Sequence, residues 1–142
     1  MRLVIEADGG SRGNPGPAGY GALVLDADTD EVLAESAEGI GVATNNVAEY
    51  QGLIAGLRAA VALAERGPVA DVEVRMDSKL VVEQMSGRWR VKHPAMQPLA
   101  LEAGRLVRDL GGVRFTWVPR ARNKRADRLA NEAMDAQSQP AP

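Results

Sequence analysis

The sequence predicts a single α/β domain built on a mixed five-stranded sheet, with three antiparallel strands, two further strands added in parallel, and helices on its flanks. Three observations support this fold class. Short stretches of alternating apolar and polar residues indicate strands, and longer stretches with apolar residues three or four positions apart indicate helices. The two kinds follow each other in the order β-β-β-α-β-α-α-β-α, in which helical crossovers join parallel strands.

The first three strands are expected to be antiparallel neighbours. In the first of them apolar and charged residues alternate up to Asp8, where the strand is expected to end. The glycines and prolines of residues 9–17 then predict a rigid turn. The three predicted strands cover residues 2–8, 19–25 and 32–40.

The longest helical pattern begins at Asn45 and runs for about 22 residues, to a stop at Gly67-Pro68. Thr44 or Asn45 can cap its first turn, because a side-chain oxygen there accepts backbone N–H bonds that have no partner inside the helix. Glu49 lies at the head of the apolar stripe of this helix, so its side chain is expected to point toward the body of the protein. The stripe consists of Leu53, Ile54, Leu57, Ala60, Val61 and Ala64.

The second half of the chain alternates between helices and strands. Its predicted elements are a strand at 72–76, a short helix at 79–85 capped by Ser78, a helix at 99–110, a strand at 113–118 and a helix at 123–136. Residues 86–98 are expected to be irregular and basic, and 119–124 to form a basic loop. The domain is therefore predicted to cover residues 1–136, and the Gln-, Ser- and Pro-rich residues 137–142 to be a disordered tail or a linker stub.

Composition excludes several kinds of site. The absence of cysteine and the single histidine, His93, rule out disulfides, thiolate nucleophiles and His-rich metal sites. No segment approaches transmembrane length, so we expect a cytoplasmic location and no membrane partner.

Residues 1–73 carry 4 basic and 12 acidic side chains, whereas residues 74–142 carry 13 basic and 7 acidic. A second half that faces a polyanion would give this asymmetry, and so would charge pairing between the two halves.

Four carboxylates are expected to meet at one edge of the sheet. Asp8 and Asp77 end two predicted strands, Glu49 begins the long helix, and Asp127 lies in the first turns of the last helix. Carboxylates that close repel one another unless a cation neutralises them. With oxygen donors and no histidine or cysteine, that cation should be magnesium or manganese. Each residue taken alone also has a plainer interpretation, as a turn residue, a cap or a solvated helix side chain.

Each of these carboxylates belongs to a longer motif. The motifs are Asp8-Gly9-Gly10-Ser11 followed by Gly13-Asn14-Pro15-Gly16-Pro17-Ala18-Gly19-Tyr20-Gly21, then Thr44-Asn45-Asn46-Val47-Ala48-Glu49, Met76-Asp77-Ser78 and Ala126-Asp127-Arg128-Leu129-Ala130. In this order, and over nearly the whole chain, they resemble type 1 ribonuclease H. The chain looks similar to the N-terminal ribonuclease H domain of actinobacterial proteins in which a phosphatase-like domain follows, which implies a possible C-terminal fused domain.

The resemblance implies a ribonuclease H-like fold and endonucleolytic cleavage of the RNA strand of RNA–DNA hybrids by two magnesium ions, with manganese as a possible substitute. Asp8, Glu49, Asp77 and Asp127 would be the metal ligands. The implied substrate-binding positions in these motifs are Gly9, Gly10, Asn14, Thr44, Asn45 and Asn46. Short polar side chains suit this task, because the wide minor groove of a hybrid exposes 2′-hydroxyls and base edges.

The chain departs from the family pattern at three places. Residues 119–123 hold no histidine where many relatives have one, and Arg120 resembles the substitute found in one branch of the family; its catalytic role would be electrostatic, because arginine cannot act as a base. The long basic handle of some members is also missing, and Val42 stands where relatives often carry a basic phosphate contact, so modest, salt-sensitive affinity is expected. Further substrate contacts are expected from Lys79, Trp89, Arg90, Lys92 and Arg122, although core packing is an equal alternative for Trp89. His93 is expected to be a surface residue.

The expected partner is therefore an RNA–DNA hybrid, with double-stranded RNA as a possible second substrate, and the chain is expected to be a monomer. Two alternatives stay open. One is a catalytically weak hybrid-binding module, which would require the loss of a carboxylate. The other is a resolvase-like nuclease of the same fold, against which the Asn45-Asn46 pair just before Glu49 argues.

Overall fold

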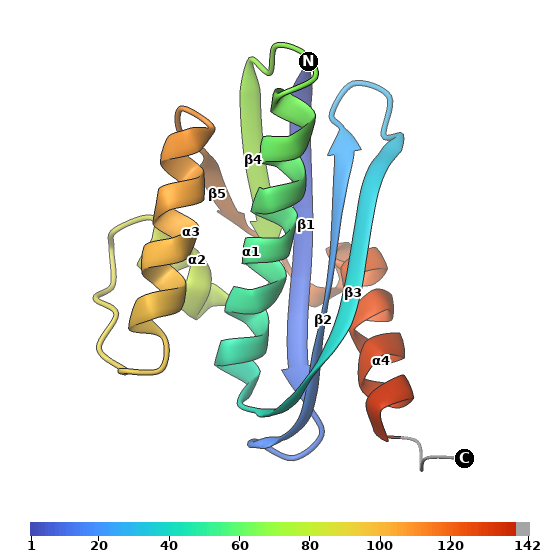
Figure 1. Cartoon of the computed structure of the whole chain (residues 1–142), viewed down its shortest axis with the longest axis vertical. Helices are drawn as coiled ribbons and strands as arrows, with labels where there is room; N and C mark the ends of the chain where they lie inside the picture. The colour runs from blue at the N-terminus through green and yellow to red at the C-terminus, as the bar shows by residue number, and fades with distance from the viewer. Residues whose placement is uncertain (139–142) are drawn as a thin grey trace.

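Five strands form one sheet in the order β3-β2-β1-β4-β5, as Figure 1 shows. The computed structural model describes residues 1–138. The strands are β1 (Arg2–Ser11), β2 (Gly16–Asp26), β3 (Val32–Ala43), β4 (Asp71–Met76) and β5 (Arg114–Trp117). The helices are α1 (Asn45–Ala64), α2 (Lys79–Met85), α3 (Gln97–Asp109), the 3₁₀ turn η1 (Arg120–Arg122) and α4 (Lys124–Ser138).

The pairing of the strands confirms the predicted mixed sheet. β1 pairs with β2, and β2 with β3, in antiparallel orientation. On its other side β1 pairs with β4 in parallel, and β4 pairs with β5 in parallel. The carboxyl ends of β1, β4 and β5 therefore lie at the same end of the sheet, which is where the sequence places Asp8 and Asp77.

The helices cover the two faces of the sheet unequally. On β2, Ala22 lies against α1, whereas its neighbour Gly21 lies against Ala126 and Leu129 of α4. Because successive strand residues point to opposite faces, α1 and α4 pack on opposite sides of the sheet. Figure 1 shows α3 beside α1 on the same face, so the larger apolar core lies between these helices and the sheet.

Several element boundaries differ from the predictions. β1 does not end at Asp8 but continues through Gly9 and Gly10 to Ser11, because these residues still pair with β2. β3 likewise continues to Ala43, where it pairs with Gly16. Gly9 and Gly10 are therefore strand residues, and the turn is confined to residues 12–15, where Gly13 has a φ of 83°. Glycine fits in the strand because the strand and α1 approach each other closely, and a side chain at Gly9 would collide with the backbone of Ala48.

The last helix is longer than predicted. α4 extends to Ser138 instead of ending at residue 136. The side chain of Gln137, which was expected in a disordered tail, donates to the carbonyl of Gly41 over 3.1 Å and accepts from its N–H over 2.7 Å. These bonds tie the end of α4 to β3. The rest of the predicted tail, residues 139–142, lies outside the described residues.

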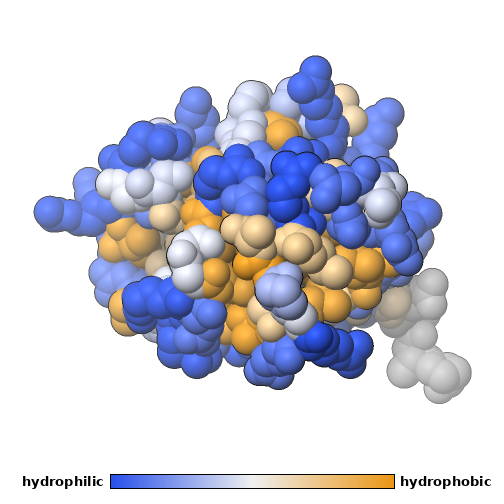
Figure 2. Space-filling view, turned by 90° about the horizontal axis from the view of Figure 1, so that it is seen from above, coloured by the Kyte–Doolittle hydropathy of each residue, from blue (hydrophilic) through white to orange (hydrophobic). Residues whose placement is uncertain are grey.

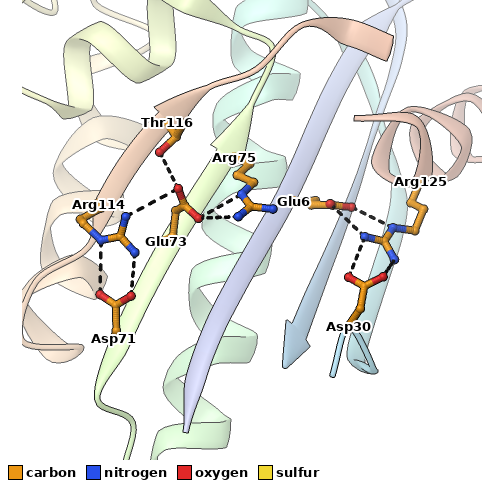
Figure 3. Close-up of polar contacts among 8 residues, drawn as sticks. All are labelled: Glu6, Asp30, Asp71, Glu73, Arg75, Arg114, Thr116 and Arg125. Atoms are coloured by element: carbon orange, nitrogen blue, oxygen red, sulfur yellow. Dashed lines mark hydrogen bonds and ion pairs between the residues drawn. The ribbon is translucent and has the colours of Figure 1, made fainter. Parts of the chain in front are cut away.

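On the same face as α4, charged side chains line the part of the sheet that this helix leaves uncovered. Figure 3 shows them in two groups, one between Arg125 of α4 and two acids, the other across β4 and β5. The groups consist of Glu6, Asp30 and Arg125, and of Asp71, Glu73, Arg75, Arg114 and Thr116. Each acid in these groups has an arginine partner, so this sheet face remains polar without a covering helix.

The end of the molecule where β1, β4 and β5 begin is more apolar. Figure 2 looks onto this end and shows hydrophobic side chains gathered at its centre, with hydrophilic ones around them. Val69, Leu110 and Val113 line a cavity of about 330 Å³ between the starts of β4 and β5. Among the described residues, no helix combines the length and the apolar character that crossing a membrane requires.

The close approach of α1 to β1 leads to a prediction about stability. A Cβ atom added at Gly52 would lie 2.7 Å from the backbone oxygen of Asp8. We expect Gly52→Ala to lower the free energy of unfolding by about 1–3 kcal/mol, because helix and strand must move apart. Urea unfolding measures this. The matched control is Gly67→Ala, where an added Cβ meets nothing within 4 Å. Equal stability of the two variants would contradict the prediction.

Candidate active site

The carboxyl ends of β1 and β4 border a cleft of about 390 Å³. All four carboxylates singled out from the sequence line it, together with Arg120 and three of the expected substrate contacts. The lining residues are Asp8, Gly9, Gly10, Ser11, Arg12, Asn45, Glu49, Asp77, Arg120, Asp127, Asn131 and Met134. The structure thus brings together carboxylates that are up to 119 positions apart in the chain, from Asp8 to Asp127.

Each carboxylate comes from a different element. Asp8 belongs to β1 and faces the α4 side of the sheet, whereas Asp77 directly follows β4. Glu49 lies in the second turn of α1, and Asp127 in the first turn of α4. Because β1 and β4 are parallel neighbours, their ends hold Asp8 and Asp77 side by side, and the two helices add one carboxylate from each side.

Burial and crowding raise the pKa of Asp8 to about 8. Desolvation is the largest cause, since only 8% of the residue is exposed. Repulsion from Asp77 comes next, followed by a hydrogen bond to Asp127 and repulsion from it. A hydrogen bond from the backbone N–H of Gly9 acts in the opposite direction. Without a cation, Asp8 therefore holds a proton near neutral pH.

Glu49 is perturbed in the same direction. Burial raises its pKa to about 7, and the charge of Asp77 adds to this effect. A hydrogen bond with the side chain of Ser78 lowers the pKa and offsets part of the rise. The Ser78 oxygen also caps α2 by accepting from the N–H of Val81 over 3.3 Å. Ser78, which directly follows Asp77, thus caps α2 and also contacts the carboxylate of Glu49.

The donor set of the cleft suits a hard divalent cation. Four carboxylates converge there, and magnesium and manganese prefer such oxygen ligands. Among the described residues, no three acidic or histidine side chains already surround one point as the ligands of an ion. A bound cation would favour the ionised forms of Asp8 and Glu49, whose pKa values burial raises.

Arg120 reaches the cleft from η1. Its Nη2 atom lies 3.3 Å from Oδ1 of Asp127, and 76% of its side chain is exposed. The guanidinium therefore stands at the mouth of the cleft, with most of its donors facing solvent. The sequence predicted Arg120 in the catalytic set, and the structure places it against one of the four carboxylates.

Asn123 is a residue that the sequence did not single out. It is fully buried, and its Nδ2 donates to the backbone oxygen of Ala7 over 2.9 Å and to Oδ1 of Asp77 over 3.3 Å. It thereby joins the end of β1 to the carboxylate that follows β4. Within residues 1–138 its Oδ1 atom has no hydrogen-bond partner. A signal was present, since Asn123 is one helical turn before Asp127, but its partners are distant in sequence.

The start of α1 is fixed by hydrogen bonds among the predicted substrate contacts. Thr44 is the N-cap, and its side chain accepts from the N–H of Val47 over 3.3 Å. Asn14 accepts from the N–H of Asn45 over 3.0 Å. The Oδ1 atom of Asn45 accepts from the N–H of Ser11 over 2.8 Å, which leaves its amide nitrogen as a donor at the cleft. Capping is thus the task of Thr44, and Asn45 links α1 to the end of β1.

Two further clefts adjoin this helix start. One of about 180 Å³ is lined by Asn14, Thr44, Asn46, Val47, His93 and Met96. The other, of about 760 Å³, is lined by Asn46, Leu80, Gln84, Arg88, Trp89, Arg90, Lys92, His93 and Met96. The expected contacts of the basic loop therefore lie together, and Asn46 and His93 border both clefts. Trp89 is 46% exposed, so the alternative that it packs in the core is wrong.

Lys79 and Arg122 lie outside these three clefts. Lys79 is exposed, and its Nζ stands 5.9 Å from the ring centroid of Trp117, a cation–π arrangement. The indole N–H of Trp117 donates to the backbone oxygen of Asp77 over 3.1 Å. Lys79 is therefore near the carboxylates, whereas Arg122 is an exposed residue at the end of η1.

Comparison with known proteins agrees with this architecture. A family model described as reverse transcriptase-like matches residues 6–133. A bifunctional protein of Mycobacterium tuberculosis is 62% identical over 99% of this chain, which spans 38% of that protein's length. The solved N-terminal ribonuclease H domain of a Mycobacterium tuberculosis protein has a TM-score of 0.92 and 62% identity, covering 98% of this chain and 97% of that one.

Two other relatives are similar over their whole length. The LC11 ribonuclease H1, solved in complex with an RNA/DNA hybrid, has a TM-score of 0.88 and 41% identity, covering 94% of this chain and 97% of that one. A ribonuclease H of Erythrobacter litoralis is 33% identical over 96% of this chain and 99% of its own length. The sheet order, the position of the four carboxylates and these similarities lead to one conclusion: the chain belongs to the type 1 ribonuclease H family.

Proposed function

We propose that this chain hydrolyses the RNA strand of RNA–DNA hybrids, with two divalent cations, normally Mg²⁺, held by Asp8, Glu49, Asp77 and Asp127. The observation that carries this proposal is the convergence of four carboxylates from four elements in one cleft. Burial and repulsion among these carboxylates raise the pKa of Asp8 to about 8 and that of Glu49 to about 7 when no cation is bound. The structure of LC11 ribonuclease H1 with an RNA/DNA hybrid supports the choice of substrate.

When bound, the divalent cations supply Lewis-acid chemistry, lowering the pKa of an attacking water and stabilising the leaving oxygen. The chain's own residues position the strand and shape the field around it. Asn123 and the parallel pairing of β1 with β4 fix where Asp8 and Asp77 stand. Arg120, at the mouth of the cleft, stabilises negative charge that develops on the phosphate or the leaving oxygen.

Binding of the hybrid extends from the carboxylates along the start of α1. The free amide nitrogen of Asn45 faces the same cleft as the carboxylates, where it can donate to a base edge or a 2′-hydroxyl. Asn46 borders the neighbouring cleft, in which Arg90 and Lys92 offer positive charge and Trp89 an exposed aromatic face. This second cleft suits the complementary strand, whose phosphates pair with cations and whose sugars or bases stack.

The reaction makes a direct prediction. An end-labelled RNA–DNA hybrid should be cut in its RNA strand in Mg²⁺ and left intact in EDTA. Asp77→Asn should lower the rate by at least about 1000-fold, because one carboxylate of the cleft loses its charge. Gel analysis of the products measures both effects. Asp109→Asn, on exposed α3, is the matched control and should keep the normal rate.

Other outcomes of the same experiment have a clear meaning. Binding of the hybrid without cleavage would leave a hybrid-binding module in place of an enzyme. Cleavage of branched DNA in preference to the hybrid would identify a resolvase-like nuclease. Matched DNA and RNA duplexes in parallel reactions show whether double-stranded RNA is a second substrate.

Arg120 gives a second kinetic prediction. Arg120→Gln should reduce kcat by about 100-fold while KM changes much less, because an electrostatic contact is lost that strengthens as charge develops. Steady-state kinetics on the hybrid separates the two constants. Arg128→Gln removes the same charge from an exposed position on α4 and serves as the control. A loss confined to KM would show that Arg120 binds the substrate without assisting the chemical step.

The raised pKa of Asp8 predicts how stability depends on pH in EDTA. The folded state holds the Asp8 proton up to about pH 8, whereas an unfolded aspartate releases it near pH 4. The stabilising contribution is complete below about pH 4 and is lost as the pH rises toward 8. Asp8→Asn, which mimics the protonated form, should therefore have a Tm a few degrees above that of the unsubstituted protein at pH 8, and about the same Tm at pH 4.

Thermal unfolding with Mg²⁺ completes this test. Mg²⁺ should raise the Tm of the unsubstituted protein at pH 8, because it neutralises the crowded carboxylates, and should raise that of Asp8→Asn much less. Identical pH profiles for the two proteins in EDTA would show that crowding does not destabilise the cleft.

A further inference from the structure

Arg12 lines the same cleft as the four carboxylates, although neither the sequence motifs nor the proposed chemistry assigns it a task. It follows β1 directly, in the short turn that leads to β2. Its side chain is 44% exposed, so its guanidinium is accessible to a ligand. Among the cleft-lining residues of the described chain, Arg12 and Arg120 are the cations that face four acids.

The guanidinium of Arg12 is held by α4. Its Nη2 atom donates to Oδ1 of Asp135 over 2.8 Å and to Oδ1 of Asn131 over 3.2 Å. Asn131 in turn donates to the backbone oxygen of Asp127 over 2.9 Å. Arg12 is thus oriented by the helix that also supplies one of the four carboxylates. A guanidinium has five N–H donors, and these contacts use one nitrogen, so further donors remain for a phosphate.

The two arginines stand at different places along α4. Arg120 pairs with Asp127, whereas Arg12 pairs with residues four and eight positions further along the helix. At about 1.5 Å of rise per residue, their partners are separated by about 6 to 12 Å along the helix axis. The two guanidinium groups are thus held at different points along α4, and each is a cationic contact for a strand that passes over the carboxylates.

We infer that Arg12 binds a backbone phosphate of the RNA strand, one next to the phosphate that is cleaved and distinct from the one near Arg120. The inference rests on the proposed function, because the strand that crosses the carboxylates is the one that would be cut. Its physical basis is charge: a cleft with four acids repels a polyanion, and a cation at its rim offsets this repulsion. The alternative is structural, namely that Arg12 only ties the β1–β2 turn to α4.

The test measures hybrid binding without turnover. In the Asp77→Asn background, Arg12→Gln should weaken the Kd for a fluorescent hybrid about 3- to 10-fold at low salt. It should also lower the slope of log Kd against log salt by about 1, as expected when one phosphate contact is lost. Arg12→Lys should retain most of the slope. Arg2→Gln is the matched control, because Arg2 is another exposed arginine paired with an aspartate, Asp28, at the far end of β1.

Three results would overturn the inference. An unchanged Kd and slope for Arg12→Gln would mean that Arg12 touches no phosphate. Equal weakening by Arg2→Gln would mean that only the net charge of the protein matters. A lowered Tm with an unchanged salt slope would mean that Arg12 has a structural role. If the Asp77→Asn parent itself fails to bind the hybrid, the proposed function fails instead. The titration of the parent alone shows this separately.

A second arm identifies the strand. Single phosphates of the hybrid are replaced by neutral methylphosphonates, first in the RNA strand and then in the DNA strand. One replacement in the RNA strand should weaken binding in the parent and have little further effect in Arg12→Gln, because both changes remove the same contact. If the coupled position lies in the DNA strand, the assignment of Arg12 to the RNA strand is wrong.

Discussion

The crowding of four carboxylates at the carboxyl ends of β1 and β4 is the constraint on which the rest of the structure depends. Desolvation and repulsion raise the pKa of Asp8 to about 8 and that of Glu49 to about 7, so the fold maintains an arrangement that is unfavourable by itself. Several contacts hold the surrounding framework in place. Parallel pairing fixes the two strand ends, Asn123 joins them, and α1 approaches β1 so closely that Gly52 has no room for a side chain. Sites that bind cations and charged substrates commonly show this combination of strain and support.

One helix serves several parts of the site. α4 covers β1, β2 and β3, and its first turn supplies Asp127. The same helix holds Arg12 through Asn131 and Asp135, and the turn before it contributes Arg120. The opposite wall comes from the start of α1. Hydrogen bonds accepted by the side chains of Asn14, Thr44 and Asn45 hold this helix start in place. The cleft therefore lies between two helices that pack on opposite faces of one sheet. It is located where the carboxyl ends of β1 and β4 meet the starts of these helices.

The sequence predicted what depends on local pattern. The order of strands and helices along the chain, the short helix α2 at residues 79–85 and the position of Asp77 after β4 all followed from alternation, capping and length. The end of β1 was wrong, because Gly9 and Gly10 signal a turn locally while cross-strand pairing with β2 decides otherwise. Asn123 and Arg12 were missed for a related reason: their roles come from partners more than 40 positions away, such as Asp77 and Asp135, and no local spacing announces them. Trp89 stayed ambiguous because a tryptophan's burial depends on packing around it, and the structure leaves it exposed.

The central claim is that a divalent cation takes the place of the protons that crowding keeps on Asp8 and Glu49. Titration calorimetry of Mg²⁺ into the protein at pH 7, in two buffers of different ionisation enthalpy, measures the protons released per ion bound. The account predicts a net release of protons that diminishes as the pH rises above 8, since the two groups are then already ionised. Binding with no proton release at pH 7, or release that is unchanged by Asp8→Asn, would contradict it.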